Sequence, residues 1–470
     1  ENYIQYARHD PLHPGALGLG EGTASLILNC FLLLSYTSPV LGAVIADQHL
    51  GRYKTLVLSL SIYFLGLSIS LITSIPALLD KGAGLPGVII SIIIVSLALG
   101  GIKAALPPFF AEQCKPFSPK LRVLKSGKKV IVTHEETLEY AFNVYYWGVN
   151  VGCQAMVVST FLEKYLGFWT SFLSTLIAIL IAFTLLILGH KHFVEALPCP
   201  SVAKAGQVCY IAACKGFELD AARPAQLTPQ MRSTVNWDDS FIDEMQMALT
   251  ASRIGIPLIF YWLSQNQLLS NTISQAGTME THGVPNNLIA DVNGIVVLIV
   301  LPLVTHVLNP ALRQWKIAFT PVTRIALGFL LEVLAMGYAG VVQALVYAAP
   351  PCYNQPLDCS ASDGGRLPNQ VNVAVQLPIY ILEGTSEVFS NPAVYEYAFT
   401  VAPKSMKSIL QAIFTLTAAA GSGLGMALAP VYHNPNMVIV YSSLGGVMTI
   451  CTVGTFCFLR PKSTRVQSGG

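Results

Sequence analysis

The sequence predicts an all-α integral membrane protein. Apolar residues make up 53% of its 470 residues, whereas charged residues make up only 11%. A soluble chain of this length would need polar groups to cover its surface, and this one has too few. A bilayer is the fitting solvent, because its hydrocarbon core of about 30 Å requires about 20 apolar residues in each spanning helix. The apolar stretches show no period-two alternation, so a β-barrel is not expected.

Eleven stretches are apolar and almost free of charge inside, and each is long enough to cross the bilayer as a helix. Lys and Arg concentrate in alternate connections, which places those connections in the cytoplasm and residues 1–22 outside the cell. The predicted spans are 23–46, 55–78, 85–109, 141–162, 166–189, 254–277, 288–308, 325–349, 371–399, 409–431 and 436–459.

The polar segment 190–250 separates five spans from six. Membrane proteins built from two equal halves carry six spans in each, so we expect a first helix upstream of residue 1; a true eleven-span protein is the alternative. Within the polar segment, 190–236 is expected to be a flexible tether and 237–253 a surface helix. The predicted organisation is an N-terminal bundle over 1–190, a cytoplasmic linker over 191–250 and a C-terminal bundle over 251–470.

The few polar groups inside the spans lie on different helices. Ionisable groups are costly there and usually face a bundle interior or a water-filled path, so the set predicts the lining of a cavity. For Lys103, about one turn from the cytoplasmic end of its span, snorkelling to the interface is an equal alternative. The set comprises Lys103, Glu332, Glu383 and Glu387, with the uncharged Asn29, Asn150, Gln265, Asn266, Gln267 and Asn293.

Glu383 and Glu387 are four residues apart and share one face of their predicted helix. Two carboxylates this close in a low-dielectric site should not both ionise, so the pair is suited to carrying a proton. Glu387, Glu383 and Glu332 are therefore the candidates for proton coupling. The alternative for Glu383 is an orientation toward the lipid headgroups.

Cys352 and Cys359 share the predicted external loop 350–369. That loop lies in an oxidising compartment, where a disulfide between the two is expected. Two free loop thiols are the alternative.

The motifs of common enzyme classes are absent. The chain has no H-E-x-x-H, no Walker A sequence, no G-x-S-x-G and no G-x-G-x-x-G after a predicted strand. We therefore expect no enzyme, no metal site and no cofactor, and uphill movement of a solute would draw on an ion gradient. A net charge of +2 gives no support for nucleic-acid binding.

Several motifs, in order along the chain, resemble those of the proton-dependent oligopeptide transporters, a family of the major facilitator superfamily. Residues 42–55, GAVIADQHLGRYKT, resemble the family's cytoplasmic loop between helices two and three. The runs GGIK (100–103) and PPFFAEQ (107–113) resemble its helix-four motif, and YWGVNVG (146–152) its helix-five motif. The runs SEVF (386–389) and EYAFTVAPKSMKS (396–408) resemble the end of helix ten in its fungal form.

The resemblance implies twelve helices in two six-helix bundles, with a peptide site between them at mid-membrane. It implies that Lys103 holds the peptide carboxylate and that Glu387 binds its ammonium group. Tyr146 and Asn150 would contact the peptide backbone and amino end, and Asn293 matches the helix-eight Asn. Asp47, Gly51 and Arg52 would belong to the loop that takes part in the conformational change.

The implied function is proton-coupled symport of di- and tripeptides across the plasma membrane by alternating access. Its partners would be peptides, protons and lipid, and we expect a monomer. The family's helix-one motif would lie before residue 1, and its helix-seven acidic residue is replaced by Gln265 or Asn266. We therefore hypothesise that Glu383 and Glu387 carry the proton. The alternatives are the same fold carrying another small solute such as nitrate, or a truncated, receptor-like member that does not transport.

Overall fold

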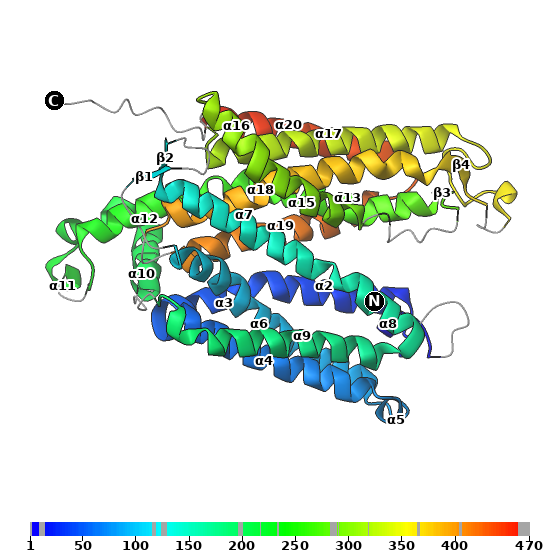
Figure 1. Ribbon diagram of the computed structural model, residues 1–470, viewed down its shortest axis with the longest axis horizontal. Coiled ribbons are helices and arrows are strands. Elements are labelled where there is room, and N and C mark those ends of the chain that lie inside the picture. The colour runs from blue at the N-terminus through cyan, green and yellow to red at the C-terminus, as the bar shows by residue number, and fades with distance from the viewer. Residues whose placement is uncertain are drawn as a thin grey trace. The chain divides into compact units, whose positions relative to one another are not determined.

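The computed structural model is mostly helical (Figure 1). Backbone contacts divide the chain into two compact units. Unit 1 comprises Glu1–Ala141, Gly152–Arg253 and Ala398–Ala419, and unit 2 comprises Phe142–Val151, Ile254–Tyr397 and Ala420–Gly470. The predicted bundle boundaries at residues 190 and 251 stay a prediction, because contact units and helical bundles partition a chain differently. The structure describes residues 2–8, 15–114, 119–123, 129–195, 201–216, 218–232, 235–282, 289, 291–317, 319–363, 367–403 and 407–458.

Within the described residues, nine segments are long and apolar enough to cross a membrane. This agrees with the predicted fold class, but the number of eleven spans stays a prediction. The predicted spans 141–162 and 371–399 are largely helical too, although residues 371 and 372 belong to strand β4, and they carry Tyr146, Asn150 and Glu387. The nine segments are Cys30–Leu50, Arg52–Ser74, Gly84–Glu112, Phe168–Leu188, Asp239–Gly277, Val292–Gln314, Pro321–Ala348, Leu410–Leu428 and Met437–Cys457.

Unit 1 is built on α4 and α6, which pack extensively on each other, and α9 packs on α4. Strands β1 and β2 form an antiparallel pair in which Lys120 faces Val132. The elements of unit 1 are α1 (Asn2–Gln5), α2 (Glu21–Thr37), α3 (Pro39–Val44), the π-helix η1 (Ile45–Leu50), α4 (Arg52–Ser74), α5 (Pro76–Leu79), α6 (Gly84–Glu112), β1 (Lys120–Val123), β2 (Lys129–Val132), α8 (Ala155–Leu166), α9 (Phe168–Leu188), η2 (His190–His192), α10 (Ser201–Cys214), η3 (Leu219–Ala222), η4 (Pro224–Gln226), α11 (Pro229–Arg232) and α12 (Asp239–Ser252).

Two glycines allow α3 and α6 to approach closely. A Cβ at Gly42 would lie 2.5 Å from the backbone oxygen of Gly100, and a Cβ at Gly100 would lie 2.5 Å from Ser38. These separations are too short for any side chain, so small residues are required where helices meet at this distance. The contact fixes α6, which carries Lys103, against α3.

Unit 2 has its core between α13, α17 and α20, where Ala335, Met336, Ala339 and Tyr441 are almost fully buried. Strands β3 and β4 form a short parallel pair. The elements are α13 (Gly255–Gly277), β3 (Met279–Glu280), α15 (Val292–Leu303), the π-helix η5 (Val304–Leu308), α16 (Asn309–Gln314), α17 (Pro321–Ala348), η6 (Ser360–Ser362), β4 (Asn369–Asn372), η7 (Val373–Gln376), η8 (Ala429–Val431) and α20 (Met437–Phe458), with most of α18 (Leu377–Val401) and parts of α7 (His134–Cys153) and α19 (Lys407–Leu428).

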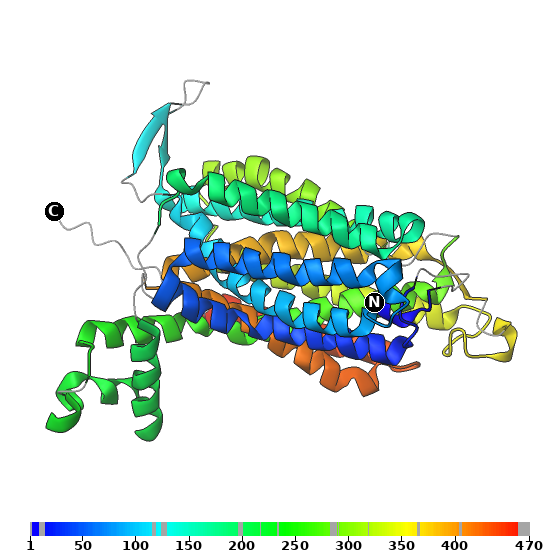
Figure 2. The same ribbon diagram turned by 90° about the horizontal axis from the view of Figure 1, so that it is seen from below.

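The described part of the linker is folded, so the expected flexible tether does not hold for these residues. Helices α10, α11 and α12 form a small group (Figure 2), here called the linker subdomain, residues 201–252. Trp237 donates a hydrogen bond from Nε1 to the backbone oxygen of Ala222 at 3.1 Å. The expectation of a flexible tether failed because the apolar residues of this segment occur in short runs along the sequence. They come together in one core only when the separate helices pack. That core contains Val208, Ile211, Ala222, Leu227, Trp237, Phe241, Ile242 and Met245.

The linker subdomain also contains a cluster of ion pairs around Arg223. Arg223 bonds Asp220 at 2.6 Å and Asp243 at 2.7 Å. The bond from Arg223 holds the pKa of Asp220 below its usual value. A lowered carboxyl pKa stabilises the fold above the unfolded value and loses that effect as the pH falls through the folded value. The contribution of this pair is therefore present at neutral pH and disappears in acid.

Trp237→Ala is expected to unfold the linker subdomain locally. Removing a buried Trp costs about 3–5 kcal/mol, which is large for a core of this size. Limited proteolysis and amide hydrogen exchange over residues 201–252 should both increase. Tyr210→Ala is the control, because Tyr210 is 72% exposed on α10, and it should leave both measurements unchanged. Equal protection in the Trp237 variant and the natural protein would contradict the packed core.

Candidate functional site

Glu387 is the centre of a hydrogen-bonded group in unit 2. It lies on α18 and accepts a bond from the Tyr146 hydroxyl at 2.6 Å and from Asn293 Nδ2 at 2.9 Å. Tyr146 comes from α7 and Asn293 from α15, and both are more than nine-tenths buried. Three of the five residues implied for peptide binding are thus brought together by three helices that are far apart in the sequence.

Gly384 lets α15 come close enough for this contact. A Cβ at Gly384 would lie 2.9 Å from the backbone oxygen of Asn293 and equally far from its Oδ1. A larger residue there would push α15 away from α18. The glycine lies three residues before Glu387, on the same side of the helix, so it sets the distance between the Asn293 amide and the Glu387 carboxylate.

Asn391 extends the group and was not among the predicted site residues. Its Nδ2 donates to the Tyr146 hydroxyl at 2.7 Å, and its side chain is 7% exposed. Asn391 follows Glu387 by four residues, so the shared helical face was a signal that could have identified it. Tyr146 accepts from Asn391 and donates to Glu387, which fixes the direction of its O–H bond.

Asn150 has a local contact instead. Its Nδ2 donates to the backbone oxygen of Tyr146 at 3.0 Å, within α7. The residue is 8% exposed. This bond holds the Asn150 side chain along its own helix, one turn after Tyr146.

Glu332 and Glu383 also belong to unit 2, and both side chains are fully buried. Burial of Glu383 within unit 2 excludes the orientation toward lipid headgroups. Glu332 Oε2 accepts a long bond from Gln265 at 3.5 Å. Neither carboxyl oxygen of Glu383 has a hydrogen-bond partner among the described residues. The structure thus places both residues close to Glu387 in the fold but outside its hydrogen-bonded group.

Lys103 lies in unit 1, on α6, and is half-buried. Its ammonium group lies 4.2 Å from the centre of the Tyr36 ring on α2. A cation above an aromatic face is stabilised by the negative potential of the ring. Tyr36 therefore holds the Lys103 side chain in place without neutralising its charge.

The predicted gating loop carries an ion-paired cluster in unit 1. Asp47 lies in the π-helix η1, and Gly51, at φ 76°, turns the chain into α4. Only glycine adopts this left-handed conformation readily. Arg52, the first residue of α4, bonds Asp47 at 3.2 Å and also pairs with Glu112 at the end of α6. Glu112 lies in the quoted helix-four motif, but its role as a partner of Arg52 was not predicted.

A second buried ion pair occurs in unit 2. Arg324, near the start of α17, pairs with Glu396 on α18, and both side chains are at most 6% exposed. Arg324 adjoins a predicted span, where a basic residue is expected in a cytoplasmic connection, and Glu396 lies in the helix-ten motif. Their pairing depends on α17 and α18 lying side by side, which the sequence did not indicate.

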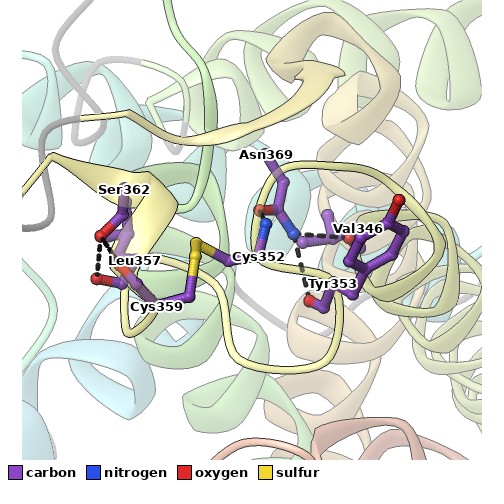
Figure 3. The surroundings of a disulfide bond; sticks show 7 residues. All are labelled: Val346, Cys352, Tyr353, Leu357, Cys359, Ser362 and Asn369. Atoms are coloured by element: carbon purple, nitrogen blue, oxygen red, sulfur yellow. Dashed lines mark hydrogen bonds between the residues drawn. A yellow bond between two sulfur atoms is a disulfide. The ribbon is translucent and has the colours of Figure 1, made fainter.

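Cys352 and Cys359 form a disulfide in the loop that follows α17 (Figure 3). Asn369 organises the same loop, because its Nδ2 donates to the backbone oxygens of Val346 at 2.8 Å and Tyr353 at 3.1 Å. Its Oδ1 accepts from the backbone N–H of Cys352 at 3.2 Å. Among the described residues, no group of three or more His, Cys, Asp or Glu is placed to hold a metal ion.

Comparisons with known proteins agree on one family. The model of the POT family matches residues 53–445. The chain is 37% identical over 447 residues to the "Probable peptide transporter ptr2" of Schizosaccharomyces pombe, an alignment that covers 94% of this chain and 71% of that protein. It is 36% identical to the "Peptide transporter PTR_B" of Candidozyma auris, covering 95% of this chain and 76% of that one.

The fold also matches solved structures. The crystal structure of the POT family transporter PepTSo superimposes with a TM-score of 0.64 and 19% sequence identity. The superposition covers 98% of this chain and 92% of that one. At this identity the likeness concerns the fold, which is that of the major facilitator superfamily.

Proposed function

Because this chain belongs to the POT family, we propose that it carries di- and tripeptides across a membrane by proton-coupled symport. Its curated relatives are named as peptide transporters, which supports a carrier and not an enzyme. The fold supports alternating access by movement of two helical bundles. The remaining proposals concern which residues bind the peptide, where the proton binds and where the protein acts.

The hydrogen-bonded Glu387 group carries this proposal. A dipeptide has an ammonium group at one end, and burying such a charge requires an opposite charge and several hydrogen bonds. Glu387 supplies the opposite charge, while Tyr146 and Asn293 hold its two oxygens in place. Within the described residues no ion pair involves Glu387, so its negative charge is available to a ligand. Such preorganisation reduces the cost of binding.

Lys103 is the proposed partner of the peptide carboxylate. Its position above Tyr36 leaves the three N–H donors of the ammonium group free of any carboxylate partner among the described residues of unit 1. Asn150 is proposed to contact the peptide backbone once its bond to Tyr146 is exchanged for one to the ligand. Since only the charged ends and the backbone are recognised, we expect broad tolerance of peptide side chains.

The proposed driving force is a proton gradient, with Glu387, Glu383 and Glu332 as the residues that bind the proton. The proposed gating element is the loop of Asp47, Gly51 and Arg52, whose ion pairs would break and re-form during each cycle. We propose a monomer in the plasma membrane.

A carrier of nitrate or another small anion is the second candidate. An anion would be repelled by the buried carboxylates around Glu387, whereas an ammonium group is attracted. The Glu387 group therefore favours peptides. A receptor-like member that binds without transporting is the third candidate, and transport itself distinguishes it.

Uptake into proteoliposomes tests the proposed function. The vesicles are given an inward proton gradient and either a labelled dipeptide or labelled nitrate. We expect the dipeptide to accumulate above its equilibrium level and a protonophore to abolish this accumulation. Accumulation of nitrate alone would support the second candidate, and binding of the dipeptide without accumulation would support the third.

A further inference from the structure

A row of buried polar side chains, here called the file, lies in unit 2 where α13, α17 and α18 pack against one another. Gln376 ends η7, and Tyr380 and Glu383 follow it on the adjoining α18 at spacings of four and three residues, which places the three on one side of this continuous segment. Each of them is fully buried. Polar groups are rare inside membrane-spanning bundles, so a continuous file of them requires a function or a complete set of partners.

The first part of the file has such partners. Gln376 Nε2 donates to Gln275 Oε1 at 2.7 Å, and Gln275 Nε2 donates to Gln343 Oε1 at 2.7 Å. The Tyr380 hydroxyl donates to Thr272 Oγ1 at 3.1 Å. Most of these neutral groups satisfy one another, although Gln376 Oε1 has no hydrogen-bond partner among the described residues.

The second part has too few donors. Gln265 Nε2 is shared between the Tyr261 hydroxyl at 3.1 Å and Glu332 Oε2 at 3.5 Å. The Ser386 hydroxyl donates to the backbone oxygen of Gly328 at 2.8 Å, with a longer contact of 3.4 Å to the Tyr261 hydroxyl. The donors near the Glu332 carboxyl are therefore the Gln265 amide, which is shared with Tyr261, and the Ser386 hydroxyl, which is already bonded to Gly328.

Two carboxyl groups in this part of the file lack hydrogen-bond donors. Both oxygens of Glu383 and Oε1 of Glu332 have no hydrogen-bond partner among the described residues, and both side chains are fully buried. No ion pair within the described residues involves either group. An ionised carboxylate in this environment would cost several kcal/mol. A bound proton removes the charge and supplies the missing donor.

We propose that Glu332 and Glu383 form a proton-binding site of their own, distinct from the peptide-binding group at Glu387. This inference deepens the proposed function and rests on it. The titratable groups that face this site are Tyr261 from α13 and Tyr380 and Glu387 from α18. None of these groups is a base that could neutralise the two carboxylates.

The hydrogen bonds of Glu387 and Glu383 differ, and this difference suits the two residues to different roles. Of the three carboxyl groups proposed to bind the proton, Glu387 has donors on both oxygens, which favour its ionised form and suit it to bind an ammonium group. Glu383 has no donors among the described residues and is suited to exchange a proton. Because the two lie one helical turn apart on α18, a proton on Glu383 removes a repulsion that acts on the Glu387 charge. Protonation of the new site is thereby coupled to the charge that binds the peptide.

Glu383→Gln and Glu332→Gln test this site, because glutamine keeps the shape and imitates the protonated state. Two measurements are made in proteoliposomes: net uptake of a dipeptide as a function of pH between about pH 5 and about pH 8, and exchange of labelled for unlabelled dipeptide at fixed pH. We expect the acid stimulation of net uptake to fall to about onefold in each variant, while exchange stays within about twofold of the natural protein. Asp358→Asn, an exposed acid-to-amide change in the same unit, is the control and should keep the natural pH profile.

The outcomes separate this inference from the proposed function. An unchanged pH profile in both glutamine variants would overturn the proton site, and so would loss of exchange together with loss of uptake, because the site would then belong to peptide binding. Uptake that follows a sodium gradient and not a proton gradient would overturn the choice of ligand. Absence of any dipeptide uptake or exchange by the natural protein would instead refute the proposed function.

Discussion

Glu387→Gln is expected to weaken dipeptide binding by at least about 30-fold. Removing one partner of a buried charge pair costs about 2–5 kcal/mol, and about 1.4 kcal/mol corresponds to a factor of ten. Glutamine keeps the size of the side chain, so the contacts to Tyr146 and Asn293 can be retained in part. The loss therefore reports the missing negative charge. The concentration dependence of dipeptide exchange at fixed pH measures it.

A graded series checks this interpretation. Tyr146→Phe removes one hydroxyl donor from Glu387 and leaves the carboxylate and its charge in place, so a loss smaller than that of Glu387→Gln is expected. Asp358→Asn serves again as the surface control. An affinity for dipeptides that is equal in the Glu387 variant and the natural protein would show that the ammonium group binds elsewhere.

Arg324→Met is expected to destabilise unit 2 by about 3–5 kcal/mol. The substitution removes the Arg324 guanidinium from the buried Glu396 carboxylate, and removing one member of a buried ion pair is costly. The apolar stem of methionine fills much of the space of the Arg side chain. Thermal unfolding of the detergent-solubilised protein should therefore begin at a markedly lower temperature.

The double variant distinguishes charge from packing. Arg324→Met combined with Glu396→Gln removes both charges and should recover most of the lost stability, because neutral replacement of a buried ion pair costs far less than halving it. The exposed Arg313→Ala is the control, with an expected change within about 0.5 kcal/mol. A double variant as unstable as the single one would indicate that packing, and not charge, dominates at this position.

Many of the buried polar residues could be identified in the sequence from their rarity alone. A carboxylate in an apolar span has few explanations, so Glu332, Glu383 and Glu387 are conspicuous within their spans. The structure buries Glu332 and Glu383 completely and gives Glu387 two donors. Their spacing on one helix predicted the neighbourhood of Glu383 and Glu387. It did not predict that their hydrogen-bonding environments would be opposite.

The interactions that were missed depend on helices packing side by side. Asn391 on α18 contacts Tyr146 on α7, and Glu396 on α18 pairs with Arg324 on α17. Arg324 directly precedes the predicted span 325–349, a position where a basic residue is normal and gives no sign of a buried partner. Pairwise contacts of this kind require knowledge of which helices are neighbours, and one sequence does not contain it.

The structure also gives Gln265, an uncharged residue at a position where the family carries an acid, a physical role. The resemblance placed an uncharged residue, Gln265 or Asn266, where related proteins carry an acid on helix seven. In the structure Gln265 contacts Glu332, which lies on α17. The carboxyl group thus comes from a neighbouring helix, and the amide at position 265 is its hydrogen-bond donor.

The most direct test of the central claim, that Glu387 binds the ammonium group of the peptide, is a competition experiment. A free dipeptide, its N-acetylated form and its C-amidated form compete with a labelled dipeptide for exchange by the natural protein and by Glu387→Gln. We predict that the natural protein rejects both modified forms, and that the variant loses its discrimination against N-acetylation while keeping that against C-amidation. Discrimination against the N-acetylated form that is undiminished in the variant would contradict the claim.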